Sequence, residues 1–223
     1  MSELNWQGFE QDIKSRRSKI EKSWQLDIVK AKETTQSSIM KILDFPESRQ
    51  PFTYDCGASA YQQQLMYYGR EFREEELIKA LNTVSTKIFN NGTKFKDIIS
   101  FTKKQKLKYD FFEGLEAQNL IDFIDKKIPV LILLQAYPEK NDHKKMDWSK
   151  DYKDGHYVNA IGYTKDKIIF EDPSSFTRTF LTFTELNERW HGVNDEGKND
   201  EISKAFIIYS TPNFKSNEIK HMD

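Results

Sequence analysis

The chain has 223 residues, of which 37% are apolar and 13% aromatic, so it can bury the core of one sizeable domain and is unlike a disordered chain. Its 34 Lys and Arg nearly balance 35 Asp and Glu, which gives no electrostatic case for nucleic-acid binding. No apolar run reaches membrane-spanning length and no secretory signal is visible. We therefore expect a cytoplasmic protein without a membrane span, with export by a signal-less route left open.

Residues 1–45 are predicted to form an N-terminal helical arm. Apolar residues recur from Trp6 to Leu43 mostly at helical spacings, but polar side chains interrupt the stripe. We expect the arm to dock on the main domain, on a second copy of the chain as a homodimer, or on a partner, and an inhibitory pro-segment is the alternative. The main domain is expected over residues 46–212, and a C-terminal tail over residues 213–223.

Helices are predicted to come first in the main domain, and strands to follow. The helical period indicates helices over residues 56–69, 74–84, 93–104, 116–127 and, later, 184–190. Apolar runs and alternating patterns indicate strands over residues 128–137, 156–163, 167–172, 178–182 and 204–210. This order predicts an α+β fold, with N-terminal helices followed by an antiparallel β-sheet. The polar stretch over residues 140–155 is predicted to be a long loop.

The single cysteine, Cys56, is the candidate nucleophile. It lies where an extended segment meets a predicted helix, so unpaired N–H groups and the helix dipole favour its thiolate. One cysteine excludes an intrachain disulfide and a zinc site built from cysteines, and the ordinary alternative is a buried structural cysteine. Gly57 leaves room beside the sulfur, and we expect it to contact substrate.

A histidine and an aspartate are predicted to meet on neighbouring strands. His156 opens a predicted strand, where its ring can be held as a general base, and His191 is the second choice. If Thr164–Asp166 is a three-residue link between the strands, His156 and Asp172 lie diagonally on one face of the hairpin. A register shift of one residue would place Asp172 on the opposite face.

Three further residues are expected near the substrate. Gln50 lies six positions before Cys56, and a side-chain amide there can donate to an oxyanion together with the Cys56 N–H. Trp148 lies in the polar loop that leads into Gly155 and His156, and we expect Gly155 and Trp148 to border the substrate cleft. The alternative for Trp148 is a structural plug that packs on the domain.

The order of these residues, with the cysteine at a helix start, resembles the papain-like plan. The stretch from Gln50 to Gly57 resembles the cysteine motif of the C39 peptidases and their C39-like relatives, and residues 155–163 and 170–174 resemble the family's His and Asp motifs. The resemblance runs from about residue 50 to residue 210. It implies a papain-like cysteine peptidase fold and a free-standing member without a transporter part.

The resemblance also implies a role for each candidate residue. Cys56 is the nucleophile, His156 the base, Asp172 the orienting group and Gln50 the oxyanion donor. Family members cleave peptide bonds, so we expect a peptide or protein substrate and no metal or organic cofactor. Two alternatives stay open: an acyl transferase on the same fold, and a catalytically silent peptide-binding or regulatory module.

Overall fold

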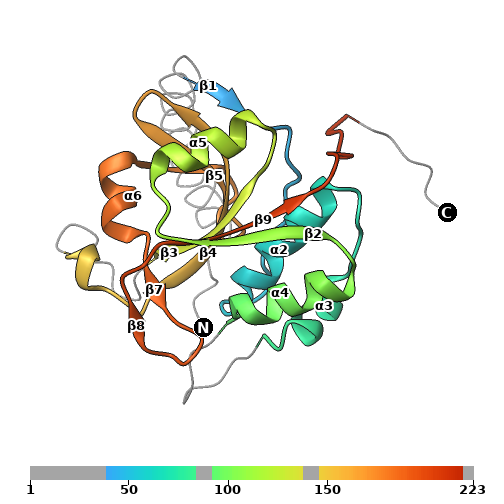
Figure 1. Cartoon of the computed structure of the whole chain (residues 1–223), viewed down its shortest axis with the longest axis horizontal. Coiled ribbons are helices and arrows are strands. Elements are labelled where there is room, and N and C mark those ends of the chain that lie inside the picture. The colour runs from blue at the N-terminus through green and yellow to red at the C-terminus, as the bar shows by residue number, and fades with distance from the viewer. Residues whose placement is uncertain (1–38, 84–91, 138–145, 218–223) are drawn as a thin grey trace, which may run out of the picture. The chain divides into compact units, whose positions relative to one another are not determined.

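A computed structural model describes residues 39–83, 92–137 and 146–217 of the chain (Figure 1). Nearly all of the predicted N-terminal arm lies outside these residues. The arm's docking, dimer and inhibitory roles therefore stay predictions. None of the described helices is long and apolar enough to cross a membrane.

The centre of the fold is a seven-stranded sheet. Its strands are β1 (Ile39–Ile42), β2 (Lys108–Glu113), β3 (Val130–Gln135), β4 (Gly155–Thr164), β5 (Lys167–Glu171), β6 (Thr179–Thr182) and β9 (Lys204–Tyr209). They follow the order β2-β9-β3-β4-β5-β6, and β1 also pairs with β4. The neighbours along this order pair antiparallel. The predicted α+β class is confirmed.

Five α-helices pack around this sheet within the described residues. They are α2 (Cys56–Tyr67), α3 (Glu74–Ala80), α4 (Phe95–Lys104), α5 (Ala117–Asp125) and α6 (Phe183–Arg189). In Figure 1, α2, α3 and α4 lie together on one side of the sheet, and α5 and α6 lie on the other. Helices on both sides explain why β3 is an uninterrupted apolar strand, since neither of its faces meets water.

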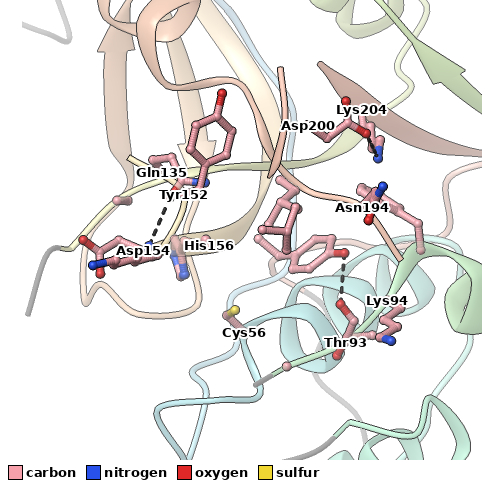
Figure 2. A pocket seen from close by; sticks show the side chains of 18 of the residues that line it. Cys56, Thr93, Lys94, Gln135, Tyr152, Asp154, His156, Asn194, Asp200 and Lys204 are labelled. Atoms are coloured by element: carbon pink, nitrogen blue, oxygen red, sulfur yellow. Dashed lines mark hydrogen bonds and ion pairs between the residues drawn. The ribbon is translucent and has the colours of Figure 1, made fainter. Parts of the chain in front are cut away.

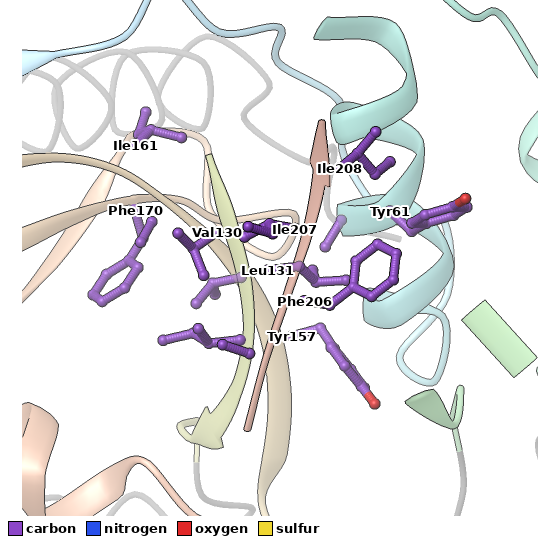
Figure 3. Close-up of a cluster of buried hydrophobic side chains, with 14 of the residues drawn as sticks. Tyr61, Val130, Leu131, Tyr157, Ile161, Phe170, Phe206, Ile207 and Ile208 are labelled. Atoms are coloured by element: carbon purple, nitrogen blue, oxygen red, sulfur yellow. The ribbon is translucent and has the colours of Figure 1, made fainter. Parts of the chain in front are cut away.

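The core fixes α2 against the sheet. Figure 3 shows Tyr61 of α2 beside Phe206 of β9, and their ring centroids are 6.0 Å apart. The Tyr61 hydroxyl bonds the Thr102 hydroxyl at 2.8 Å, so its polar end is satisfied although the side chain is fully buried. From β4, Asn159 Nδ2 donates to the Ala60 carbonyl at 2.7 Å. Apolar and polar contacts together therefore set where α2, and Cys56 at its start, meets β4.

Two strands of the sheet are not predicted from the sequence. The helical spacing of the arm continues to Leu43, but Ile39–Ile42 is strand β1, so the predicted helix is wrong there. The Leu43 N–H donates to the carbonyl of Ile161 at 2.8 Å, which extends the contact with β4. Lys108–Glu113 forms the edge strand β2, and none of its residues is fully buried, so its pattern carries little strand signal.

The turn of the β4–β5 hairpin differs from the predicted one. The sequence predicts the three-residue link Thr164–Asp166, but β4 continues through Thr164 and leaves the two-residue turn Lys165–Asp166. Tyr163 consequently pairs with Ile168. If this pairing continued along the whole hairpin, Asp172 would lie on the face opposite to His156.

A β-bulge restores the register nearer the start of β4. The pairing shifts by one residue between Ala160 and Gly162, so that Ala160 pairs with Phe170. The bulge therefore cancels the error in the predicted loop length. His156 and Asp172 are in contact as predicted, but they meet because of a bulge that was not predicted from the sequence.

Candidate active site

A cleft of about 1310 Å³ opens where the start of α2 faces the start of β4. Four of the predicted site residues line it: Gln50, Cys56, Gly155 and His156. Figure 2 shows the sulfur of Cys56 and the ring of His156 in the same part of this cleft. The structure thus brings the candidate nucleophile and base together from segments 100 residues apart in the sequence.

The imidazole of His156 joins Cys56 to Asp172. His156 Nε2 lies 2.8 Å from Asp172 Oδ1, and the two side chains are only 7% and 3% exposed. The Cys56 side chain lines the same cleft as the ring and interacts with it electrostatically. Because Asp172 occupies Nε2, Nδ1 is the ring atom left for the sulfur. The predicted contact between His156 and Asp172 is confirmed.

Both members of this buried pair favour their charged forms. Burial opposes a positive imidazole, but hydrogen bonds with Asp172 and Cys56 and the charges of both residues outweigh it and raise the pKa of His156 to about 10. Burial alone would raise the pKa of Asp172, yet the hydrogen bond and charge of His156 hold it below its ordinary value. At neutral pH the site therefore holds an imidazolium beside a carboxylate.

Three more groups hold the carboxylate of Asp172. The Tyr137 hydroxyl donates to Oδ2 at 2.6 Å, the Ser174 N–H donates to Oδ1 at 2.9 Å, and the Thr179 hydroxyl donates to Oδ2 at 3.3 Å. Each carboxylate oxygen therefore has two donors, which fixes its orientation. Tyr137 also meets the His156 ring edge-on, with centroids 5.2 Å apart. Sequence reasoning missed Tyr137, whose only signal is its place just after a buried strand.

Gln50 is held at three points. Its main-chain N–H donates to the Pro173 carbonyl at 3.0 Å, its side-chain Nε2 donates to the Phe52 carbonyl at 2.6 Å, and its Oε1 accepts from the Ser174 hydroxyl at 2.8 Å. A carboxamide carries two N–H donors. Within the described residues no acceptor takes the second one. Gln50 thus lines the cleft with an amide that is held in place and has one N–H available to a ligand.

Gly57 packs closely against its neighbours and is not among the residues that line the cleft, so its predicted contact with substrate stays a prediction. A Cβ placed on Gly57 would lie 2.6 Å from Thr93 Cβ and 3.0 Å from Tyr157 Cδ2. The Tyr157 hydroxyl donates to the Thr93 carbonyl at 3.1 Å, so these two residues form a fixed surface against the first turn of α2. The missing side chain therefore lets α2 approach β4 closely. Gly155 is exposed and lines the cleft, as predicted.

Trp148 is not among the residues that line this cleft, and its contact with substrate stays a prediction. It lies in a short 3₁₀ helix, η1 (Trp148–Lys150), and its ring is buried. The Arg189 guanidinium stacks 4.0 Å from the ring centroid. Trp148 lines a smaller cavity of about 270 Å³ on the other side of His156 and Asp172. Its burial and its contact with Arg189 favour the alternative, a structural plug.

The second-choice base, His191, is held away from the cleft. Its Nε2 bonds the Asp151 carbonyl at 2.6 Å, and its ring packs on Tyr152 with centroids 4.7 Å apart. Its main-chain carbonyl accepts from Gln135 Nε2 at 3.0 Å. His191 is not among the residues that line the cleft. These contacts make it a structural residue that fixes the loop beside the cleft.

The far wall of the cleft is a small hairpin formed by β7 (Gly192–Val193) and β8 (Asn199–Asp200). Lys94 Nζ donates to the Asp195 carbonyl at 2.8 Å and so ties the hairpin to the start of α4. Figure 2 shows Asn194 and Lys204 across the cleft from His156. The wall therefore carries polar groups of both signs. Among the residues that the structure describes, no group of three His, Cys, Asp or Glu side chains could hold a metal ion.

The sequence profile of the Peptidase C39 like family matches residues 42–197. A search of curated proteins finds no match. The family match begins at the end of β1 and ends in the β7–β8 hairpin, so it includes Gln50, Cys56, His156 and Asp172 but not Asp200 and Lys204 of the cleft wall.

Three solved structures share the fold. The peptidase domain of Streptococcus ComA, a bifunctional ABC transporter of a quorum-sensing pathway, is 18% identical, with a TM-score of 0.50 over 74% of this chain and 97% of that one. A putative C39-like peptidase from Bacillus anthracis is 15% identical, with a TM-score of 0.53 over 79% and 99%. A double glycine motif protease from an AMS/PCAT transporter, in complex with the leader peptide, is 15% identical, with a TM-score of 0.50 over 78% and 98%. The profile match spans more than half of the chain and the fold is that of C39 peptidase domains, so the chain belongs to the peptidase C39-like family.

Proposed function

We propose that the protein is a cysteine peptidase that hydrolyses a peptide bond through an acyl-enzyme on Cys56. The observation that carries the proposal is the buried imidazole of His156, which lines the same cleft as Cys56 and hydrogen-bonds Asp172. A nucleophile, a base and an orienting carboxylate in this arrangement are what acyl transfer needs. Cys56 and His156 line one cleft large enough for an extended peptide, and Asp172 holds the His156 ring from outside that cleft.

The residues divide the reaction into two halves. In the first, the Cys56 thiolate forms a bond to the carbonyl carbon, and the Cys56 N–H and the spare N–H of Gln50 stabilise the oxyanion. The carbon–nitrogen bond then breaks, and the leaving amine takes a proton from His156. In the second half, His156 takes a proton from water, which attacks the thioester and releases the acid and the Cys56 thiolate.

The proposed substrate is a peptide or protein segment in extended conformation. The family assignment supports a peptide bond as the target, and one protein of the same fold is a double glycine motif protease that was solved with a leader peptide. The far wall of the cleft adds charged groups of both signs, among them Lys94 and Asp200. These groups can pair with the main chain and side chains of a peptide.

A peptide-library digest tests the proposal. The wild-type protein should cleave a subset of peptides, while Cys56→Ala and His156→Ala should cleave none and His191→Ala should retain turnover. His191 is a matched control because its ring is also buried, but it bonds the Asp151 carbonyl outside the cleft. Loss of cleavage in His191→Ala but not in His156→Ala would contradict the assignment of the base. Products that carry an added amine in place of water would indicate an acyl transferase.

A further inference from the structure

We propose that Ser174 is a positioning residue that fixes the Gln50 amide as an oxyanion donor and links it to the carboxylate of Asp172. The inference rests on the proposed function, because it concerns how the same site stabilises an oxyanion. It assigns a role to a residue that does not itself touch the reacting atoms. Ser174 follows Asp172 by two positions, so the link is short and local.

Ser174 makes two different bonds with two different atoms. Its main-chain N–H donates to Asp172 Oδ1 at 2.9 Å, and its hydroxyl donates to Gln50 Oε1 at 2.8 Å. The main chain thus serves the carboxylate, whereas the side chain serves only the amide. A substitution that removes the hydroxyl separates the two roles, since the N–H stays in place.

The direction of the Gln50 amide decides whether it helps or hinders catalysis. Only the Nε2 end can donate to an oxyanion, while the Oε1 end would repel it. In the structure Ser174 donates to the Oε1 end and the Phe52 carbonyl accepts from the Nε2 end. These two contacts hold the amide from opposite ends. Without the Ser174 hydroxyl, the amide is held at Nε2 alone and can rotate about that contact.

The main chain of Gln50 does not depend on the Ser174 hydroxyl. The Gln50 N–H donates to the Pro173 carbonyl at 3.0 Å, a contact that Ser174→Ala leaves unchanged. Ser175 provides a matched control at the next position. Its hydroxyl accepts from the Thr177 N–H at 3.2 Å, within its own turn. Ser175→Ala therefore removes the same atom without removing a bond to Gln50.

Two small reagents separate thiol reactivity from oxyanion stabilisation without knowledge of the substrate. Iodoacetamide alkylates the Cys56 thiolate by displacement at a saturated carbon, so no oxyanion forms. With p-nitrophenyl acetate, the same sulfur attacks the ester carbonyl, passes through an oxyanion, releases p-nitrophenolate and becomes an acetyl thioester. The ratio of the two rates therefore measures oxyanion stabilisation.

We expect Ser174→Ala to slow acetylation roughly three- to tenfold, the value of one neutral hydrogen bond, and to leave alkylation unchanged. Gln50→Ala should slow acetylation by roughly 10²-fold. The double variant should be no slower than Gln50→Ala, because Ser174 acts only through Gln50. Ser175→Ala should match the wild type with both reagents.

Other outcomes overturn the inference. If Ser174→Ala slows both reagents equally, if Ser175→Ala has the same effect, or if the two losses multiply in the double variant, Ser174 does not act through the amide. If the folded wild type reacts with neither reagent faster than its unfolded chain, the proposed function fails instead. The side-chain amide NMR signals of Gln50, assigned from Gln50→Ala, then decide the positioning role: a shift in Ser174→Ala alone supports it, and unchanged signals exclude it.

Discussion

Replacing Asp172 with Asn removes a charge from the active site but few of its contacts. One carboxylate oxygen accepts from His156 and Ser174, and the other accepts from the hydroxyls of Tyr137 and Thr179. An Asn that keeps its oxygen toward His156 turns its NH₂ toward the two hydroxyls, which can rotate and accept. We therefore expect Asp172→Asn to fold normally with His156 in its present orientation.

The magnitude follows from the loss of the charged acceptor. A hydrogen bond to a charged group contributes about 1.5–3 kcal/mol, and a neutral one about 0.5–1.5 kcal/mol, so His156 loses roughly 1–1.5 kcal/mol of preference for its charged form. This equals about one pH unit in the pKa of His156. Solvent screening does not reduce the effect much, since the His156 side chain is 7% exposed.

The rate of Cys56 alkylation by iodoacetamide, measured as a function of pH, reports this change in the pKa of His156. In the wild type His156 stays charged until the pH approaches its raised pKa of about 10, and above that pH the thiolate loses its cationic partner. The high-pH change in rate should therefore move about one pH unit toward neutrality in Asp172→Asn. Titration of the His156 ring signals by NMR should show the same displacement.

Asp172→Ala provides the contrast. It leaves His156, which is buried, without its acceptor, and an unsatisfied buried group costs about 1–3 kcal/mol, whereas Tyr137, Thr179 and Ser174 are exposed enough to bond water instead. Urea denaturation should therefore show a loss of about 1–3 kcal/mol for Ala and little loss for Asn. A high-pH change that stays at the wild-type position in both variants would refute the idea that Asp172 sets the charge of His156.

Two further predictions test the packing of Gly57 and Trp148. In a urea titration, Gly57→Ala should lower the free energy of unfolding by about 1–3 kcal/mol, because its Cβ would lie 2.6 Å from Thr93 Cβ. Gly155→Ala is the control and should have little effect, because its Cβ would lie 3.6 Å from Leu133 Cδ1. Trp148→Ala should lower the free energy of unfolding by about 3–5 kcal/mol and leave the rate of Cys56 alkylation unchanged in the folded protein. Normal stability with slower alkylation would instead indicate that Trp148 contributes to the cleft.

The strands that carry the site could be predicted because their signal is local. Strand β3 is a continuous apolar run, and β4 and β5 are separated by a short polar turn, so both patterns are visible without knowledge of their partners. The candidate residues Cys56 and His156 could be identified because their chemistry depends on position at the start of a helix or strand. Such positions follow from the sequence around them.

The remaining features depend on contacts with distant residues. Gly57 has no side chain because Thr93 and Tyr157 occupy the space, and neither neighbour is adjacent in sequence. Trp148 stands among charged residues, so its burial under Arg189 could not be inferred from its surroundings in the chain. Strand β2 is an edge strand whose pairing with β9 spans about half of the chain. Pattern reasoning fails where tertiary contact decides the outcome.

The bulge beside Ile161 makes the active site depend on chain length as well as on residue type. Deleting that single residue would turn His156 to the opposite face of its strand relative to Asp172, although both residues would still be present. One added residue in the Lys165–Asp166 turn would reverse the displacement. A relative that kept Gln50, Cys56, His156 and Asp172 but lost the bulge without such compensation would carry the motif without the site.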